Sequence, residues 1–136
     1  MLKSFFLGTA MACLISASAM AADLVPTADG DTVTVDSFQA VMAENPESIY
    51  LIDVRDAGEF AQGTFKGAIN IPVEQLEDKV AGLPNDKPTV FVCTTGARSG
   101  EAYDIVKMVD ESRDVYFLNA EVTFKADGNH VVTPIE

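Results

Sequence analysis

Apolar residues along the chain fall into two patterns, uninterrupted runs that predict buried strands and spaced positions that predict amphipathic helices. The clearest runs cover 49–54 and 88–93, where apolar residues follow one another with little alternation. This pattern is typical of parallel strands that are covered on both faces. Shorter runs of the same kind predict further strands over 32–35, 68–71 and 115–118.

Between the runs, apolar residues recur three or four positions apart, which predicts helices over 73–83 and 99–109. A shorter helix is expected over 56–61. Asp36, followed by Gln39 three positions later, resembles a capping box and predicts a helix that starts there and ends near Asn45.

Strands that alternate with helices indicate an α/β fold with a mainly parallel sheet. Ligands of such sheets bind beyond the carboxyl ends of the strands, and Cys93 stands at such an end. The residues after Leu118 show no firm pattern. We find no internal repeat, and we expect a single domain over 32–136, preceded by a loose lead-in over 22–31.

The N-terminus has the features of a secretory signal peptide. Lys3 is the only charge in the first 22 residues, and a short apolar stretch and small residues follow it. We expect cleavage of residues 1–21 after Ala21 and a periplasmic or secreted mature protein. The apolar stretch is too short for a membrane anchor, which needs about 20 residues. A lipoprotein anchored at Cys13 is a weaker alternative.

Charge and cysteine content narrow the possible functions. Without residues 1–21, whose only charge is Lys3, the chain has 115 residues and a formal charge of -13. Such a surface does not attract nucleic acid or anionic lipid, so any anion site must be built locally. Cys93 is then the only cysteine and cannot form an internal disulfide. In an oxidising compartment a lone cysteine is either buried and inert or kept for its chemistry.

The segment 93–99, Cys-Thr-Thr-Gly-Ala-Arg-Ser, joins a predicted buried strand to a helix. A tight loop there can turn backbone N–H groups inward around an anion, and the start of the helix adds free N–H groups. Gly96 permits unusual backbone angles, and Arg98 adds a permanent positive charge. These features predict a lowered pKa for the Cys93 thiol, and hence a nucleophile. An ordinary turn around a buried, inert cysteine is the alternative.

Three segments resemble the rhodanese family of sulfurtransferases. The segment 93–99 matches the active-site form C-x-x-G-x-R-S/T of that family. Residues 51–55 with Glu59 and Phe60 are similar to its L-I-D-V-R-x-x-x-E-F element, and 67–72 to its G-A-I-N-I-P element. The motifs occur in the same order and spacing. The small exported single-domain members are the most similar type.

The resemblance implies a three-layer α/β/α fold around a mainly parallel sheet of five strands. It implies that Cys93 attacks the outer sulfur of thiosulfate or a related donor, that sulfite leaves, and that a thiol or cyanide takes the sulfur from the Cys93 persulfide. Arg98 would favour an anionic donor, and the loop amides would hold the persulfide. The implied binding residues are Thr94, Thr95, Gly96, Ala97, Arg98 and Ser99.

Two further residues have supporting roles that the resemblance leaves partly open. Asp53 either braces the loop through Arg98 or Ser99, or has a purely structural role. Arg55 is expected to pair with Glu59 and to fix the local turn.

Loop length favours sulfur over phosphate, because the loop from Cys93 to Arg98 has six residues and related dual-specificity phosphatases have seven. Thr94 and Thr95 stand where many members carry a second cation, which argues against tight thiosulfate binding. A sulfurtransferase is therefore the preferred function. A carrier of polysulfide or sulfane sulfur and a non-catalytic interaction module are the alternatives. No cofactor is expected, and His130, the single histidine, does not make a zinc site.

Overall fold

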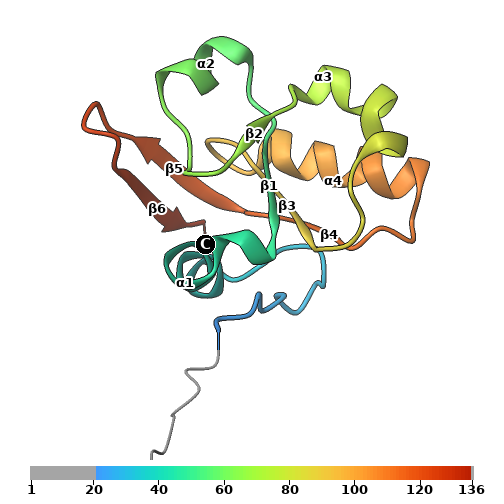
Figure 1. Cartoon of the computed structure of the whole chain (residues 1–136), viewed down its shortest axis with the longest axis horizontal. Coiled ribbons are helices and arrows are strands. Elements are labelled where there is room, and N and C mark those ends of the chain that lie inside the picture. The colour runs from blue at the N-terminus through green and yellow to red at the C-terminus, as the bar shows by residue number, and fades with distance from the viewer. Residues whose placement is uncertain (1–20, 136) are drawn as a thin grey trace, which may run out of the picture.

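The computed structural model describes residues 21–135 as a parallel sheet with helices on both faces (Figure 1). Residues 1–20, which make up all but the last residue of the predicted signal peptide, lie outside the described residues. The sheet has four strands in the order β2-β1-β3-β4. Its strands are β1 (Tyr50–Asp53), β2 (Ile69–Asn70), β3 (Thr89–Val92) and β4 (Val115–Phe117). The helices are α1 (Val35–Glu44), η1 (Pro46–Ser48), α2 (Ala57–Gln62), α3 (Val73–Leu76), η2 (Glu77–Gly82) and α4 (Ala97–Val109).

The uninterrupted apolar runs become the two central strands, as predicted. β1 and β3 pair in parallel from Tyr50 opposite Thr89 to Asp53 opposite Val92. Because successive side chains point to opposite faces, Val90 and Val92 pack toward α1, whereas Phe91 and Cys93 pack toward α3 and α4. Both faces of the sheet therefore carry a hydrophobic core, and Cys93 belongs to the core that α4 covers.

The predicted strand over 32–35 is wrong, and so is the sheet of five strands. Thr32 forms one isolated parallel bridge with Phe117 at the edge of β4. The pairing stops there because Thr34 is already the N-cap of α1, and its side chain accepts a hydrogen bond from the Ser37 amide. The predicted capping box at Asp36 is wrong for the same reason, since the N-cap lies two residues earlier, at Thr34.

The helix predicted over 73–83 is divided. Only Val73–Leu76 is α-helical, and Glu77–Gly82 continues as a 3-10 helix. Its apolar positions nonetheless lie in the core, because Leu76 and Val80 are fully buried. Within residues 21–135, no helix is long and apolar enough to cross a membrane.

The residues after Leu118, to which the sequence assigns no structure, form an antiparallel hairpin beside α1 (Figure 1). Its strands are β5 (Ala120–Phe124) and β6 (His130–Pro134), with Val122 opposite Val132. The turn between them contains Gly128 at a φ of 83°. This hairpin lies outside the parallel sheet, and its first strand reaches the loop that follows Cys93.

Candidate active site

Cys93 follows the last residue of β3 and is 3% exposed. The next three residues form a short loop, and α4 starts at Ala97. Gly96, the N-cap of α4, has a φ of 91°, a backbone conformation that residues with side chains rarely adopt. This tight turn directs the chain back over the end of β3 and brings the first amides of α4 close to the sulfur.

Several donors converge on the Cys93 sulfur. The Gly96 amide donates to Sγ at 3.1 Å, and the Ser99 hydroxyl lies 3.4 Å from it. Burial raises the pKa of the Cys93 thiol, but the hydrogen bonds from the Ser99 hydroxyl and from the amides of Thr95, Ser99 and Gly96 outweigh it. The net effect lowers the pKa, so that the thiolate is favoured relative to an ordinary cysteine.

Ser99 is fully buried and lies between two partners. Its hydroxyl is 3.4 Å from Cys93 Sγ and donates to the Leu118 carbonyl at 3.3 Å. A hydroxyl has one proton, so it can donate to only one of these groups at a time. When Cys93 ionises, rotation of the Ser99 O–H bond toward the sulfur, so that it donates to the thiolate, is therefore favoured.

Arg98 forms a bidentate ion pair with Glu59 of α2, with N–O distances of 2.7 and 3.0 Å. Its Nη2 also lies 3.5 Å from the Thr94 hydroxyl. The hydrogen bond from Arg98 outweighs the opposing effect of burial and lowers the pKa of Glu59 to about 2. Glu59 is thus ionised at neutral pH. Thr95 and Ala97 have exposed side chains.

The predicted pairing of Arg55 with Glu59 is wrong. Arg55 instead binds Asp53, with Nη2–Oδ2 at 2.6 Å, and donates to the Gly63 carbonyl at 2.6 Å. Thr64 Oγ1 donates to the same carboxylate at 2.8 Å. Asp53 is fully buried, and among the described residues it forms no hydrogen bond or ion pair with Arg98 or Ser99. Of its two proposed roles, the geometry supports the structural one.

The function of Glu59 as the partner of Arg98 was missed by the sequence reasoning. A signal was available, because β1 and β3 are adjacent parallel strands and the segments that follow them meet at one edge of the sheet. Glu59 lies six positions after the end of β1, and Arg98 lies six positions after the end of β3.

The β5–β6 hairpin and the residue before it also contact the loop that follows Cys93. The Val122 amide donates to the Thr94 carbonyl at 2.8 Å, and Asn119 lies directly against Gly96. The guanidinium of Arg55 lies 4.4 Å from the centre of the Phe124 ring. A cleft of about 510 Å³ lies between α2 and the hairpin, and Glu59, Thr94 and Lys125 are among the residues that line it.

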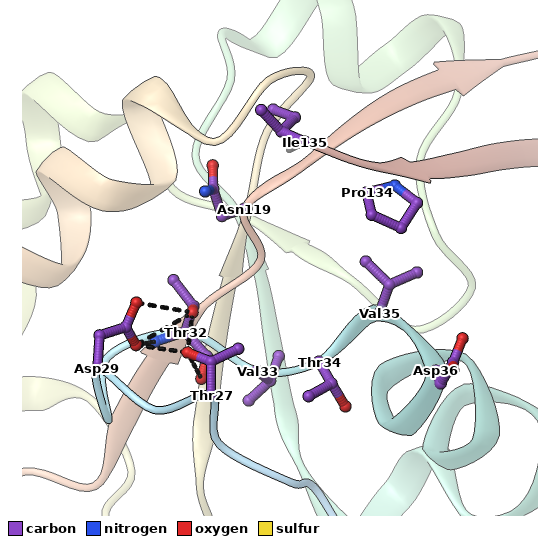
Figure 2. A pocket seen from close by; sticks show the side chains of 10 residues that line it. All are labelled: Thr27, Asp29, Thr32, Val33, Thr34, Val35, Asp36, Asn119, Pro134 and Ile135. Atoms are coloured by element: carbon purple, nitrogen blue, oxygen red, sulfur yellow. Dashed lines mark hydrogen bonds between the residues drawn. The ribbon is translucent and has the colours of Figure 1, made fainter.

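A second pocket, of about 380 Å³, lies behind Asn119, between the lead-in, the start of α1 and the end of β6 (Figure 2). The Asp29 carboxylate on its rim accepts hydrogen bonds from the hydroxyls of Thr27 and Thr32 and from the amides of Asp31 and Thr32. All these donors belong to the same turn, so the carboxylate is occupied by local structure.

Within residues 21–135, no group of three or more His, Cys, Asp or Glu side chains could hold a metal ion. His130 packs edge-on against Phe65, with ring centres 4.5 Å apart, in an aromatic cluster that also contains Phe124.

Comparison with known proteins gives a consistent result. The model of the Rhodanese-like domain family matches residues 34–122. The putative sulfurtransferase YtwF of Bacillus subtilis is 38% identical over 68 residues, 50% of this chain and 63% of that protein. The thiosulfate sulfurtransferase PspE of Escherichia coli is 39% identical over 57 residues, 40% of this chain and 55% of that protein. The chain thus spans less than two thirds of either relative. The structure of the human single-domain sulfurtransferase TSTD1 is similar, with a TM-score of 0.55 and 26% identity over 64% of this chain and 87% of that one.

Proposed function

This chain belongs to the rhodanese-like domain family, and we propose that it transfers sulfane sulfur through a persulfide on Cys93. The observation that carries the proposal is the set of hydrogen-bond donors around the Cys93 sulfur, which lowers its pKa at the end of a buried strand. The names of the relatives support the same chemistry.

In the first half-reaction the Cys93 thiolate attacks the outer sulfur of thiosulfate or of a related donor. The S–S bond of thiosulfate breaks, sulfite leaves with the bonding electron pair, and the Cys93 persulfide anion remains. In the second half-reaction a thiolate or cyanide attacks the terminal sulfur, and the Cys93 thiolate leaves. The amides of Thr95, Gly96 and Ser99 stabilise the negative charge in both steps.

Intact-mass measurement tests this proposal. Incubation with thiosulfate or inorganic polysulfide should add one sulfur atom, about 32 Da, to the wild type, and cyanide should remove it as thiocyanate. The matched control is Cys93→Ser, which keeps a side chain of similar shape and should gain no mass. If no donor adds sulfur to the wild type, sulfur transfer through Cys93 is excluded.

Turnover in the same samples separates an enzyme from a carrier. An enzyme regenerates the free thiol and releases thiocyanate continuously, whereas a carrier holds one sulfur until its acceptor arrives. We further propose that the mature protein is exported and begins at Ala22, as the pattern of residues 1–21 predicts. The intact mass of the natively expressed protein tests directly whether the mature chain begins at Ala22.

A further inference from the structure

The cleft between α2 and the β5–β6 hairpin contains a lysine without a partner. The charged residues that line this cleft are Arg55, Glu59 and Lys125. Arg55 is buried against Asp53. Glu59 is paired with Arg98. The exposed side chain of Lys125 forms no hydrogen bond or ion pair with any described residue. A lysine is positively charged at neutral pH, so Lys125 can serve as the counterion of a bound anion.

The positive charge of Lys125 stands on an acidic protein. The whole chain has a formal charge of -12, which repels anions at long range. At physiological ionic strength the attraction of a single charge extends over about 8 Å. An anion that enters the cleft is therefore stabilised only close to Lys125, and this residue marks the position of a negatively charged group of a ligand.

The hairpin fixes the backbone that carries this lysine. The Lys125 amide donates to the Asn129 carbonyl at 2.7 Å, and the Lys125 carbonyl accepts from the Gly128 amide at 3.1 Å. The preceding residue, Phe124, packs edge-on against Phe65, with ring centres 5.2 Å apart. Lys125 therefore starts from a well-supported position at the end of β5, and its side chain is the only part that has to adapt to a ligand.

The size of the cleft suits an organic molecule. Its volume of about 510 Å³ lies within the range of about 300 to 1,000 Å³ that is usual for such ligands, and it far exceeds what cyanide or thiosulfate would fill. Thr94, which directly follows Cys93, lines the same cleft as Phe124 and Lys125. Phe124 and Lys125 come after residue 122, where the match to the family model ends. This wall of the cleft therefore belongs to the hairpin of this chain.

Burial of Cys93 separates small substrates from large ones. Cys93 is 3% exposed, so a bulky molecule has poor access to Sγ itself. Once Cys93 carries a second sulfur, the acceptor needs to reach only this terminal atom, which stands one bond further from the backbone. The acceptor is therefore the substrate that can fill the cleft. A single ammonium group matches a singly charged group such as a carboxylate.

Resting on the proposed sulfur transfer, we propose that this cleft binds the sulfur acceptor, and that the acceptor is a small organic thiol whose carboxylate binds Lys125. The acceptor thiolate attacks the terminal sulfur of the Cys93 hydropersulfide. A new S–S bond forms as the bond to Sγ breaks, and Cys93 leaves as a thiolate with the electron pair. The product is the persulfide of the acceptor, R–S–SH, and no oxidant or reductant is consumed.

The experiment loads Cys93 from inorganic polysulfide, removes the excess, and follows the loss of sulfur by rapid quenching and intact mass. The acceptors are linear thiol acids from mercaptopropanoate to mercaptohexanoate, and each is compared with its neutral amide at equal thiolate concentration. In the wild type the acid-to-amide ratio of discharge rates should be highest at one chain length. In Lys125→Met this ratio should fall about fivefold, as expected of an exposed ion pair, through weaker binding rather than slower discharge at saturation.

Three further variants separate a contact with Lys125 from general effects of charge. Lys125→Arg keeps the charge and should retain the wild-type ratio, whereas Lys125→Glu should lower the ratio further than Lys125→Met does. Lys79→Met removes the same charge from η2, which packs against α3 and α4, and should leave the ratio unchanged. The same two thiols are compared in every variant, so differences in their intrinsic reactivity cancel.

Three results would overturn the inference while the proposed function stands. The first is a persulfide that cyanide discharges but that none of the thiols does. The second is an acid-to-amide ratio in Lys125→Met equal to that of the wild type. The third is a ratio that is the same at every chain length or that falls equally in Lys79→Met, which would indicate long-range attraction alone. If no donor loads Cys93, the proposed function itself fails, and the inference fails with it.

Discussion

Two short turns of this protein surround an anionic group with hydrogen-bond donors, and they have different consequences. The loop after β3 directs the Gly96 amide and the Ser99 hydroxyl at the Cys93 sulfur. The turn over 27–32 directs two hydroxyls and two amides at the Asp29 carboxylate. In both places the donors lower a pKa, that of Cys93 below its ordinary value and that of Asp29 to about 2.

The difference lies in the acceptor and in its surroundings. An exposed carboxylate is ionised at neutral pH without help, so the donors around Asp29 only stabilise the turn. A thiol is mostly protonated at neutral pH, so similar donors change how much nucleophile is present. A cluster of donors therefore does not identify a reactive site by itself. It does so when it holds a group that would otherwise be neutral, at a place where the fold positions a substrate.

The two turns also differ in what supports them. Most of the bonds of the Asp29 turn are internal, whereas the Cys93 loop is held by Asn119, Leu118 and Val122, which precede or belong to β5. We expect substitutions in the Cys93 loop to affect both stability and reactivity, and substitutions in the Asp29 turn to affect stability alone.

The largest effect is expected from Gly96→Ala. The φ of 91° is strained for alanine, and the new Cβ would lie 2.5 Å from Asn119 Oδ1 and 3.1 Å from its Cα. The side-chain oxygen can move aside, but the backbone atom must shift with β5. We expect the free energy of unfolding to fall by about 3 kcal/mol, measured by urea denaturation, together with the loss of sulfur loading.

Gly128→Ala is the matched control for that strain. Its φ of 83° is similar, but a Cβ there would meet nothing within 4 Å. The free energy of unfolding should fall by only about 1 kcal/mol, with normal loading of Cys93. Equal losses in the two variants would mean that the contact with Asn119 does not support the loop.

An intermediate effect is expected from Ser99→Ala, which removes one donor from the sulfur and leaves the amides in place. The pKa of Cys93 should rise, because the Ser99 hydroxyl is the largest of the contributions that lower it. Alkylation by iodoacetamide should be about tenfold slower at neutral pH and should recover at high pH. An unchanged pH profile of alkylation in Ser99→Ala would show that the amides alone stabilise the thiolate. Ser99→Thr is the control, because it keeps the hydroxyl and should retain the wild-type profile.

The central strands and the position of Cys93 could be predicted from the sequence. β1 and β3 are buried on both faces, and that environment requires the uninterrupted apolar runs that the sequence shows. The edge of the sheet was less predictable. The segment around Thr32 has the composition of a strand, but the N-cap of α1 at Thr34 ends its pairing with β4 after one bridge.

The ion pairs of the site could not be derived from sequence neighbours alone. Arg55 and Glu59 stand four positions apart and suggest a local pair, yet Arg55 precedes α2, and its side chain turns back to Asp53. Glu59 instead forms an ion pair with Arg98, which follows the neighbouring strand β3 at the same edge of the sheet. The hairpin was missed because β6 is mostly exposed and lacks a clear apolar pattern, although its turn holds the Asp127-Gly128 signal.

The smallest effect is expected from Asp29→Asn, which tests the other side of the comparison. Hydrogen bonds from the Thr27 hydroxyl and from the Thr32 and Asp31 amides lower the pKa of Asp29 from 3.8 to about 2. A lowered carboxyl pKa stabilises the folded state above pH 3.8, and this contribution is lost as the pH falls from 3.8 to about 2. At neutral pH the variant should therefore melt slightly below the wild type, by less than about 4 °C. The difference in Tm should shrink as the pH falls through this range.

The alkylation rate of Cys93 in Asp29→Asn should equal that of the wild type at every pH where both are folded. A change in that rate would show that the Asp29 turn acts on the Cys93 loop, with Asn119 as the candidate link, because Asn119 lines the same pocket as Asp29 (Figure 2) and lies against Gly96.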